Sequence, residues 1–349
     1  MNRAFIVVVN YTKYKDTIEC LESVLKSSYQ DFQVILIDNS PDDISENNIH
    51  NWLNGQSNDD IETLFPELIY PLVKKPIPYS YIKEEQLNDM PYLKNGRLLF
   101  VRAANKGFAA ANNLAFNYIL RQADESSFIW VLNNDTVIAK DCLENLIGFY
   151  KNGEGDTILG SKLNFYYKKE VLQAVTGRYN KWLGSTYHVG EGEIDNGQYD
   201  NFTMNPDNYI VGASMFLPFS FLKKVGLMND DYFLYYEELD WILASKQKGF
   251  KPALQANAIV YHKEGTSIEG ASFGGKNKDK SFADYYSIVN RLKFTKKWYP
   301  SCLYTVTLGV IYALLKRLCK GRFAFVNKTA KAVIKVLATD YHNNNMNNG

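Results

Sequence analysis

Apolar runs that end in polar side chains recur along the first 140 residues of the chain. The runs at 4–9, 32–37 and 128–132 are apolar apart from Gln33. Runs of this kind are typical of strands that are covered on both faces of a parallel sheet. Because the carboxyl ends of parallel strands meet at one edge of a sheet, we expect the residues that follow the runs to lie together. These residues are Asn10-Tyr11, Asp38-Asn39 and Asn133-Asn134-Asp135.

Helical patterns separate the apolar runs. Residues 14–25 carry apolar side chains at helical intervals, a further strand is expected near 98–101, and a helix at about 109–122 follows the loop at 105–108. A strand, a helix and a second strand within 40 residues are typical of a right-handed parallel unit. The pattern therefore predicts a doubly wound, Rossmann-like half over about residues 1–150.

Residues 41–96 form an insertion in this half. They are first rich in Asn and Asp and then rich in Pro and Tyr. A connection of this length inside a compact domain is normally functional or mobile. The pattern predicts no secondary structure for it.

The second half, at about 151–270, is expected to complete one domain with the first. Short β-like runs at 157–217 predict antiparallel hairpins, with one buried strand over 208–217. A helix is expected at 237–248, and a last strand ends on His262. The fold class predicted is α/β, a mostly parallel sheet with helices on both faces and a small antiparallel part.

The remaining residues, 271–349, are expected to be helical. The run at 303–315 is apolar, and four basic residues follow it within 316–322. Thirteen apolar residues are too few to span a bilayer. They suit either an interfacial helix whose basic flank meets anionic headgroups, so that the membrane is contacted through 303–322, or a buried packing helix.

Composition limits the partners and the compartment. The 349 residues carry a net charge of +1, which argues against nucleic acid as the main partner. The 25 Tyr and 20 Phe suit sugar or base platforms, but they also build ordinary cores. Four cysteines show no metal-ligand spacing, and Cys20 and Cys142 lie in apolar helical patterns, so a reducing cytosol is expected. The chain begins with a strand rather than a signal peptide.

Asp38 and Asp135 are the carboxylates at the expected sheet edge. Asp38 is suited to accept hydrogen bonds from a ribose or base. Asp135 is suited to hold a divalent metal against phosphate oxygens, with the strand-end His262 as a second ligand. The structural alternatives are turns or helix caps for the two carboxylates, and a purely structural histidine.

The segment 235–241 (Tyr-Tyr-Glu-Glu-Leu-Asp-Trp) is the other candidate for chemistry. Three carboxylates at a helix start are favoured by the helix dipole, which is a structural explanation by itself. The aromatic and apolar neighbours also indicate partial burial. Burial would raise a carboxylate pKa toward a value that suits a general base.

Taken in order, these segments resemble family 2 glycosyltransferases with the GT-A fold, and most of all the bacterial rhamnosyltransferase branch that builds surface polysaccharides. The matching segments cover about residues 4–267. They are Val-Val-Val-Asn-Tyr (7–11), Val-Ile-Leu-Ile-Asp-Asn-Ser (34–40), Asn-Lys-Gly-Phe-Ala-Ala-Ala-Asn-Asn (105–113), Leu-Asn-Asn-Asp-Thr (132–136), Gly-Ala-Ser-Met-Phe (212–216), Phe-Leu-Tyr-Tyr-Glu-Glu-Leu-Asp (233–240) and His-Lys-Glu-Gly-Thr-Ser (262–267).

The resemblance implies an inverting transfer from a nucleotide-sugar to an acceptor hydroxyl, assisted by Mn²⁺ or Mg²⁺. It implies a glycosyltransferase domain over 1–270, with donor and acceptor halves, and a helical region over 271–349. It implies that Asp135 and His262 bind the metal, and that Asp240 and Trp241 contact the acceptor. Glu238 is implied as the general base, with Glu237 as the fallback. The implied donor-binding residues are Asn10, Tyr11, Asp38, Asn39, Asn105, Gly107, Asn112 and Asn134.

Two positions depart from the family pattern. Asn133 stands where the family has the first acid of its metal motif, and Glu238 stands where an Asp is usual. The Gln-x-x-Arg-Trp pattern of processive synthases is absent, so addition of one or a few sugars is expected.

The function expected is transfer of L-rhamnose from dTDP-rhamnose to a lipid-linked surface-polysaccharide acceptor, in the cytoplasm at the inner face of the cell membrane. A UDP-hexose or UDP-galactofuranose donor is the alternative within the family. A non-catalytic protein that binds glycans or nucleotides is the alternative from another class. A nucleotidyltransferase would need a Gly-rich basic loop after the first strand, which residues 10–14 lack.

Overall fold

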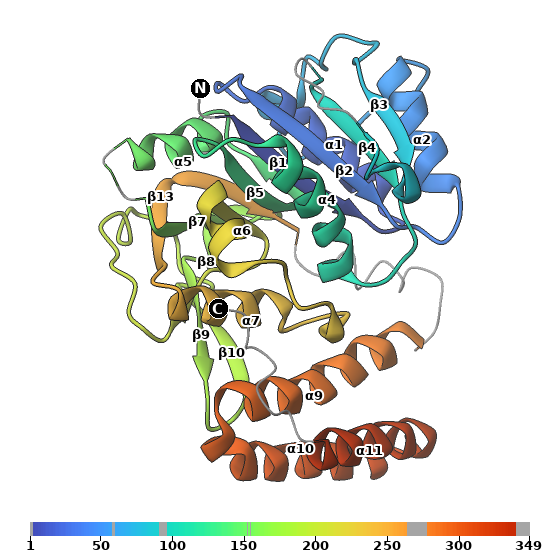
Figure 1. Cartoon of the computed structure of the whole chain (residues 1–349), viewed down its shortest axis with the longest axis vertical. Helices are drawn as coiled ribbons and strands as arrows, with labels where there is room; N and C mark the ends of the chain where they lie inside the picture. Colours follow the sequence, from blue (N-terminus) through green and yellow to red (C-terminus); the bar gives the residue numbers. More distant parts are fainter. Residues whose placement is uncertain are drawn as a thin grey trace.

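A ten-stranded sheet forms the centre of the molecule (Figure 1). The computed structural model describes residues 3–57, 60–90, 96–151, 153, 155–263 and 278–339. The strand order is β3-β4-β2-β1-β5-β12-β7-β13-β6, with β8 paired to β7. The strands are β1 (Ala4–Asn10), β2 (Phe32–Asp38), β3 (Ser80–Lys83), β4 (Leu98–Arg102), β5 (Phe128–Asn133), β6 (Thr136–Ile138), β7 (Thr157–Phe165), β8 (Lys168–Ala174), β12 (Ser214–Pro218) and β13 (Lys251–His262).

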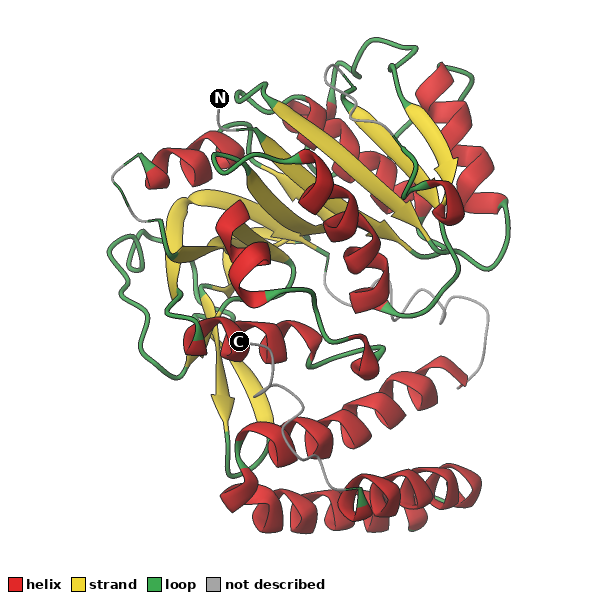
Figure 2. Ribbon diagram, viewed as in Figure 1, coloured by secondary structure: helices red, strands yellow, loops and turns green. Residues whose placement is uncertain are grey.

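The five strands from β3 to β5 are parallel, as predicted for the first half, and β12 then joins β5 in the antiparallel direction. Successive side chains of β1 point to opposite faces. Ile6 and Val8 pack on one face, whereas Phe5 and Val7 pack on the other. Both faces are therefore apolar and covered by helices, which confirms the expected α/β class (Figure 2).

Three helices cover each face of the sheet. On one side lie α1 (Tyr14–Leu25), α2 (Ile44–Asn54) and α5 (Cys142–Tyr150). On the other side lie α4 (Phe108–Gln122), α6 (Phe219–Val225) and α7 (Glu237–Gln247). Cys20 and Cys142 are fully buried on the first side, as expected for core residues.

The insertion at 41–96 is an ordered part of the sheet edge over its described residues. It contains α2, the short helix α3 (Pro66–Ile69), the edge strand β3 and a 3₁₀ turn η1 (Glu84–Gln86). The buried Glu22 of α1 accepts a hydrogen bond from Trp52 Nε1 (3.0 Å) and pairs with Lys75 Nζ (2.6 Å). None of its described residues lines either of the cavities described below.

The prediction of a single buried strand over 208–217 is wrong. Residues Asn208–Tyr209 form β11 in a separate three-stranded sheet with β9 (Thr176–Asn180) and β10 (Ser185–Val189), whereas β12 belongs to the main sheet. The two segments diverge around Gly212, where a Cβ would lie 3.2 Å from Glu238 Cγ. An apolar run cannot by itself show that its two ends join different sheets.

The C-terminal residues form a helical layer beneath the hairpin β9–β10 (Figure 1). It consists of α9 (Lys278–Trp298), a 3₁₀ turn η4 (Pro300–Cys302), α10 (Leu303–Leu318) and α11 (Phe323–Ala338). Leu292, Val310 and Val333 are among the residues of its own small core. Phe294 of α9 instead joins the main core, so α9 links the layer to the sheet domain.

Candidate active site

Strand register brings the predicted polar residues together at one sheet edge. Asn10 lies opposite Asp38 across β1 and β2, and Val9 lies opposite Asn133 across β1 and β5. The three strands therefore end at the same level, as the sequence pattern predicted.

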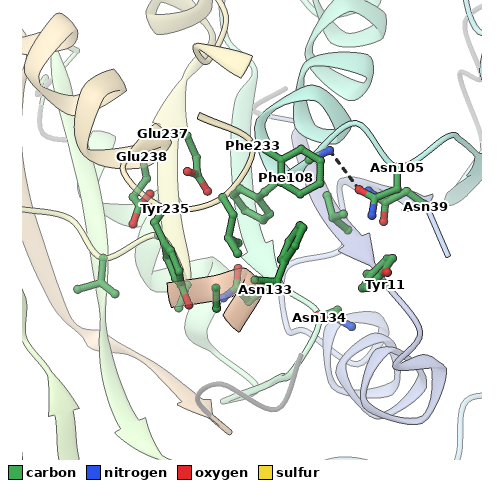
Figure 3. A pocket seen from close by; sticks show the side chains of 18 of the residues that line it. Tyr11, Asn39, Asn105, Phe108, Asn133, Asn134, Phe233, Tyr235, Glu237 and Glu238 are labelled. Atoms are coloured by element: carbon green, nitrogen blue, oxygen red, sulfur yellow. Dashed lines mark hydrogen bonds between the residues drawn. The ribbon is translucent and has the colours of Figure 1, made fainter. Parts of the chain in front are cut away.

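A cavity of about 650 Å³ opens at this edge. Figure 3 shows the amides of Asn39, Asn105 and Asn134 with Tyr11 at one end, and the carboxylates of Glu237 and Glu238 at the other. Eight residues with predicted roles line it, together with Asn133: Tyr11, Asn39, Asn105, Gly107, Asn134, Glu237, Glu238 and His262.

Asp38 is buried and does not line this cavity, and buried partners surround it, so its expected nucleoside contact stays a prediction. Its Oδ1 accepts hydrogen bonds from Asn10 Nδ2 (2.7 Å) and Ser40 Oγ (2.5 Å), and its Oδ2 pairs with Arg102 Nη1 (2.6 Å). Asn10 is likewise buried, so both residues fix the loops that carry Tyr11 and Asn39. The sequence pattern did not predict the role of Arg102, since nothing in an apolar strand pattern marks a partner 64 residues away.

Asn112, Asp240 and Trp241 also lie outside the cavity lining. Asn112 is buried within α4, where its Nδ2 donates to Phe108 O. Asp240 accepts hydrogen bonds from Tyr232 Oη and Trp298 Nε1 and pairs with Lys297, while Trp241 packs in the core. The donor contact expected for Asn112 and the acceptor contacts expected for Asp240 and Trp241 stay predictions, while the structure shows the internal partners of these side chains.

Asp135 and His262 lie side by side, as the predicted metal pair requires. Asp135 Oδ1 is 3.2 Å from His262 Nε2, and His262 Nδ1 is 2.8 Å from Gln173 Oε1. A polar partner on Nδ1 fixes the ring and directs Nε2 at the carboxylate, an arrangement that suits a divalent cation. Among the described residues, no group of three His, Cys, Asp or Glu side chains is placed to hold a metal ion. Of the matching segment at 262–267, residues 264–267 lie outside the described residues.

The two glutamates follow a backbone segment with unusual dihedrals. Phe233, Tyr235 and Tyr236 have φ values of 61°, 66° and 75°, which are costly for non-glycine residues and are common at functional sites. Asn290 of α9 supports this segment, because its Nδ2 donates to Tyr232 O (2.6 Å) and Leu234 O (2.8 Å).

Burial perturbs both carboxylates, as the sequence predicted. Desolvation raises the pKa of Glu237 well above its ordinary value, and the charge of Glu238 raises it further. Desolvation also raises the pKa of Glu238. Both groups therefore hold protons to a higher pH than a solvated carboxyl does, which is a property of general acids and bases.

Gly107 brings the donor-side loop into backbone contact with this segment. Its φ is 99°, and a Cβ there would lie 2.6 Å from Phe233 O. Phe108 N donates to the same oxygen (3.1 Å). The apolar wall that the sequence did not predict comes from Phe108, Phe233 and, on α9, Phe282.

A second cavity of about 440 Å³ adjoins the first. It lies among the hairpin β9–β10, the start of α7 and α9. Hydroxyl side chains (Ser185, Thr186 and Ser287) and Arg291 contribute to its lining. The two cavities share Tyr235, Glu238 and Ala283. Glu238 thus lies where the two spaces meet.

The low-salt glycan biosynthesis hexosyltransferase Agl10 of Haloferax volcanii is 20% identical over 161 residues, which are 46% of this chain and 48% of that protein. The chain thus spans about half the length of the curated relative that it matches.

Two solved structures show similarity at low scores. TarS of S. aureus (residues 1–349) has 13% identity and a TM-score of 0.45, covering 98% of this chain and 93% of that one. The mannosyltransferase PcManGT from Pyrobaculum calidifontis, in complex with GDP-Man and Mn²⁺, has 11% identity and a TM-score of 0.46, covering 96% and 87%. Similarities at these scores do not bear on the function of this chain.

The sequence model that matches is described as glycosyl transferase family 2, and it covers residues 84–224. That range holds the loop of Asn105 and Gly107, the strand end at Asn133 to Asp135, and β12. Over this range, the chain is similar to glycosyl transferase family 2.

Proposed function

We propose that this protein is an inverting glycosyltransferase that moves a sugar from a nucleotide-sugar to an acceptor hydroxyl. The observation that supports this best is the position of Glu238 at the junction of two cavities. A general base must reach the acceptor hydroxyl while that oxygen faces the reacting sugar carbon. A donor in the larger cavity and an acceptor in the smaller one would meet beside this carboxylate.

The nucleotide-sugar would occupy the larger cavity with its polar end toward Tyr11, Asn39 and Asn105. Side-chain amides both donate and accept hydrogen bonds, so they suit the edges of a base or ribose. Asp135 and His262 would hold one Mn²⁺ or Mg²⁺, which when bound neutralises the charge that develops on the departing diphosphate. The carboxylates of Glu237 and Glu238 lie at the opposite end of the cavity. The sugar would therefore lie between the diphosphate and these carboxylates.

The transfer would then be a single displacement. The acceptor oxygen attacks the anomeric carbon, its proton passes to the Glu238 carboxylate, and the bond between that carbon and the diphosphate oxygen breaks. The raised pKa of Glu238 makes it a stronger base than a solvated carboxylate. Glu237 is more deeply buried, and burial together with the charge of Glu238 raises its pKa, so Glu237 keeps its proton to a higher pH.

The donor we favour is dTDP-rhamnose, with L-rhamnose transferred to a lipid-linked surface-polysaccharide acceptor in the cytoplasm. It rests on the resemblance of the ordered motifs to the rhamnosyltransferase branch. A UDP-hexose or UDP-galactofuranose is the alternative donor, and the hexosyltransferase named among the relatives favours a hexose. A non-catalytic glycan- or nucleotide-binding protein is the alternative from another class, which the Asn at position 133 favours.

The test is thermal stabilisation by a panel of donors, each with Mn²⁺ and with chelator. The panel contains dTDP-rhamnose, UDP-glucose, UDP-galactose, UDP-galactofuranose and GDP-mannose. A donor at 100 times its dissociation constant should add about 2.7 kcal/mol to the free energy of unfolding. A metal-dependent shift with one donor, followed by its hydrolysis or transfer, supports the proposal. Binding without any turnover would favour the non-catalytic alternative.

A further inference from the structure

The outer side of α10 is apolar and uncovered over the part of the chain that the structure describes. Val306, Val310 and Leu314 face inward, into the core of the C-terminal layer. The large apolar side chains on the opposite side are exposed, and Tyr312 has 69% of its surface accessible. These side chains are Tyr304, Leu308, Ile311, Tyr312 and Leu315.

The tip of the hairpin β9–β10 extends this exposed side. Thr305 Oγ1 donates to Trp182 O (2.8 Å), and Thr305 precedes Leu308 and Tyr312 by three and seven residues, on the same side of the helix. Trp182 and Leu183 are 53% and 62% exposed. We call the hairpin–helix surface the set Trp182, Leu183, Tyr304, Leu308, Ile311, Tyr312 and Leu315.

The charged residues of α10, α11 and the turn between them are all basic, and two of them, Arg317 and Arg322, pair with Asp284 of α9. Residues 303–338 contain seven Lys and Arg and no Asp or Glu. Five of the seven are exposed lysines, namely Lys316, Lys320, Lys328, Lys331 and Lys335. Exposed apolar side chains beside a cluster of cations fit a surface of anionic lipid. A second copy of the chain would instead bring like charges against these lysines, which disfavours self-association there.

We infer that the hairpin–helix surface binds an anionic membrane with α10 lying in the plane of the interface. The stretch Pro300–Leu318 is 19 residues long and apolar enough to cross a bilayer by length and composition. Crossing would, however, remove Val306, Val310 and Leu314 from their contacts with α9 and α11. Lying in the interface keeps this packing and covers only the exposed side.

Docking in this way would set the orientation of the second cavity. The hairpin that carries Trp182 also lines that cavity through Ser185 and Thr186, and α9 lines it through Ser287. The cavity therefore lies beside the membrane-binding surface, where an acceptor attached to a lipid would be presented. This consequence rests on the proposed function, whereas membrane binding itself does not.

The experiment is flotation of the full-length protein with vesicles of phosphatidylcholine alone or mixed equally with phosphatidylglycerol. We expect binding to the anionic vesicles only. The double substitution Leu308→Asp with Tyr312→Asp should abolish it, while Ile194→Asp, at a 59% exposed residue beside β8, should leave it unchanged. Lys328→Gln and Lys331→Gln should each weaken binding roughly fivefold. All five substitutions are at exposed positions, so unchanged melting temperatures confirm folding.

Three outcomes would overturn the inference. Equal binding to neutral vesicles would show that the lysines do not contribute to binding. Unchanged binding of the Leu308/Tyr312 variant would place the contact elsewhere. Protein that stays with the membrane in alkaline carbonate would indicate a spanning helix. The donor-induced thermal shift of these variants is measured separately from flotation. If the transfer proposal fails, the donor-induced shift is altered while binding to the vesicles remains.

Discussion

At the scale of single residues, the environments of Glu237 and Glu238 separate their roles. Glu237 is buried, and one carboxylate oxygen has no hydrogen-bond partner. Glu238 lines both cavities, so it can reach two substrates. We therefore expect Glu238→Gln to lower kcat by about 10²–10⁴-fold, because an amide cannot take the acceptor proton. Single-turnover transfer measures this. The donor-induced thermal shift serves as the control and should persist.

The raised pKa values predict how activity and stability depend on pH. Activity needs the Glu238 carboxylate, so kcat/KM should rise with pH through a pKa above the ordinary 4.5. In the folded protein Glu237 keeps its proton to a higher pH than in the unfolded chain. The free energy of unfolding should then fall as pH rises from about 4.5 through the folded pKa.

Glu237→Gln should remove this loss of stability. We expect the variant to melt higher than the wild type at pH 8, with a smaller difference at pH 4, where both states of the wild type are protonated. Melting temperatures across this range check the sign. A variant less stable than the wild type at pH 8 would show that the Glu237 charge is compensated by contacts in the folded state.

The Asp38–Arg102 pair is a structural requirement of the sheet edge that carries Tyr11 and Asn39. Asp38 is fully buried, so Arg102→Met would leave its charge without a cationic partner. We expect a loss of about 3–5 kcal/mol from the free energy of unfolding in denaturant titrations. The matched control is Lys224→Met, which breaks the exposed pair with Asp156 and should cost less than about 1 kcal/mol. Equal effects at the two sites would contradict this interpretation.

At the scale of elements, α9 supports the segment that carries the glutamates. Phe233 stacks on Tyr286, and Asn290 binds the carbonyls of residues 232 and 234. Backbone with positive φ at non-glycine residues persists only where surrounding contacts hold it. Without Asn290, we expect this segment to relax and Glu238 to lose its position.

Asn290→Ala should therefore lower kcat more than its effect on stability explains. We expect a loss of about 1–3 kcal/mol in stability, because buried carbonyls lose their donor. The control is Asn113→Ala, which removes hydrogen bonds to Met228 N and O outside that segment. It should cost similar stability and keep kcat near wild type when both variants are measured well below their melting temperatures.

At the scale of the whole molecule, the C-terminal layer is part of the site rather than an appendage. Phe282 and Ala283 line the larger cavity, and Phe294 joins the core of the sheet domain. The domain boundary expected at 270 falls within residues 264–277, outside the described residues. That the catalytic domain ends at this boundary stays a prediction. The contacts of α9 argue against a sheet domain that is independent of the helical region.

A truncated chain that ends at residue 270 tests whether the sheet domain needs the helical region. It lacks α9, so we expect no donor-induced thermal shift and a lower melting temperature than the full chain. A chain that ends at residue 339 is the control and should behave like the full chain, since every described contact remains. A full donor shift in the shorter chain would show that the sheet domain forms the donor site alone.

Much of the donor side could be predicted because it depends on local order in the chain. Apolar runs specify buried strands, and parallel strands end at one edge, so Tyr11, Asn39 and Asn134 were placed correctly. Asp240 could not be placed, because its neighbour Glu238 turns toward the cavities while Asp240 meets Trp298. Which side of a short helix faces a cavity depends on partners that are distant in the sequence.

The sequence by itself determined the α/β class, the polar sheet edge and the acidic segment at the start of α7, because these follow from periodicity and from strand ends. Only the tertiary structure decided that Asp38 is enclosed by Arg102, that residues 208–217 serve two sheets, and that α9 lines both cavities. Each of these depends on contacts between segments tens to hundreds of residues apart. No local pattern records such contacts, because they are selected by packing and by pairing of buried charge.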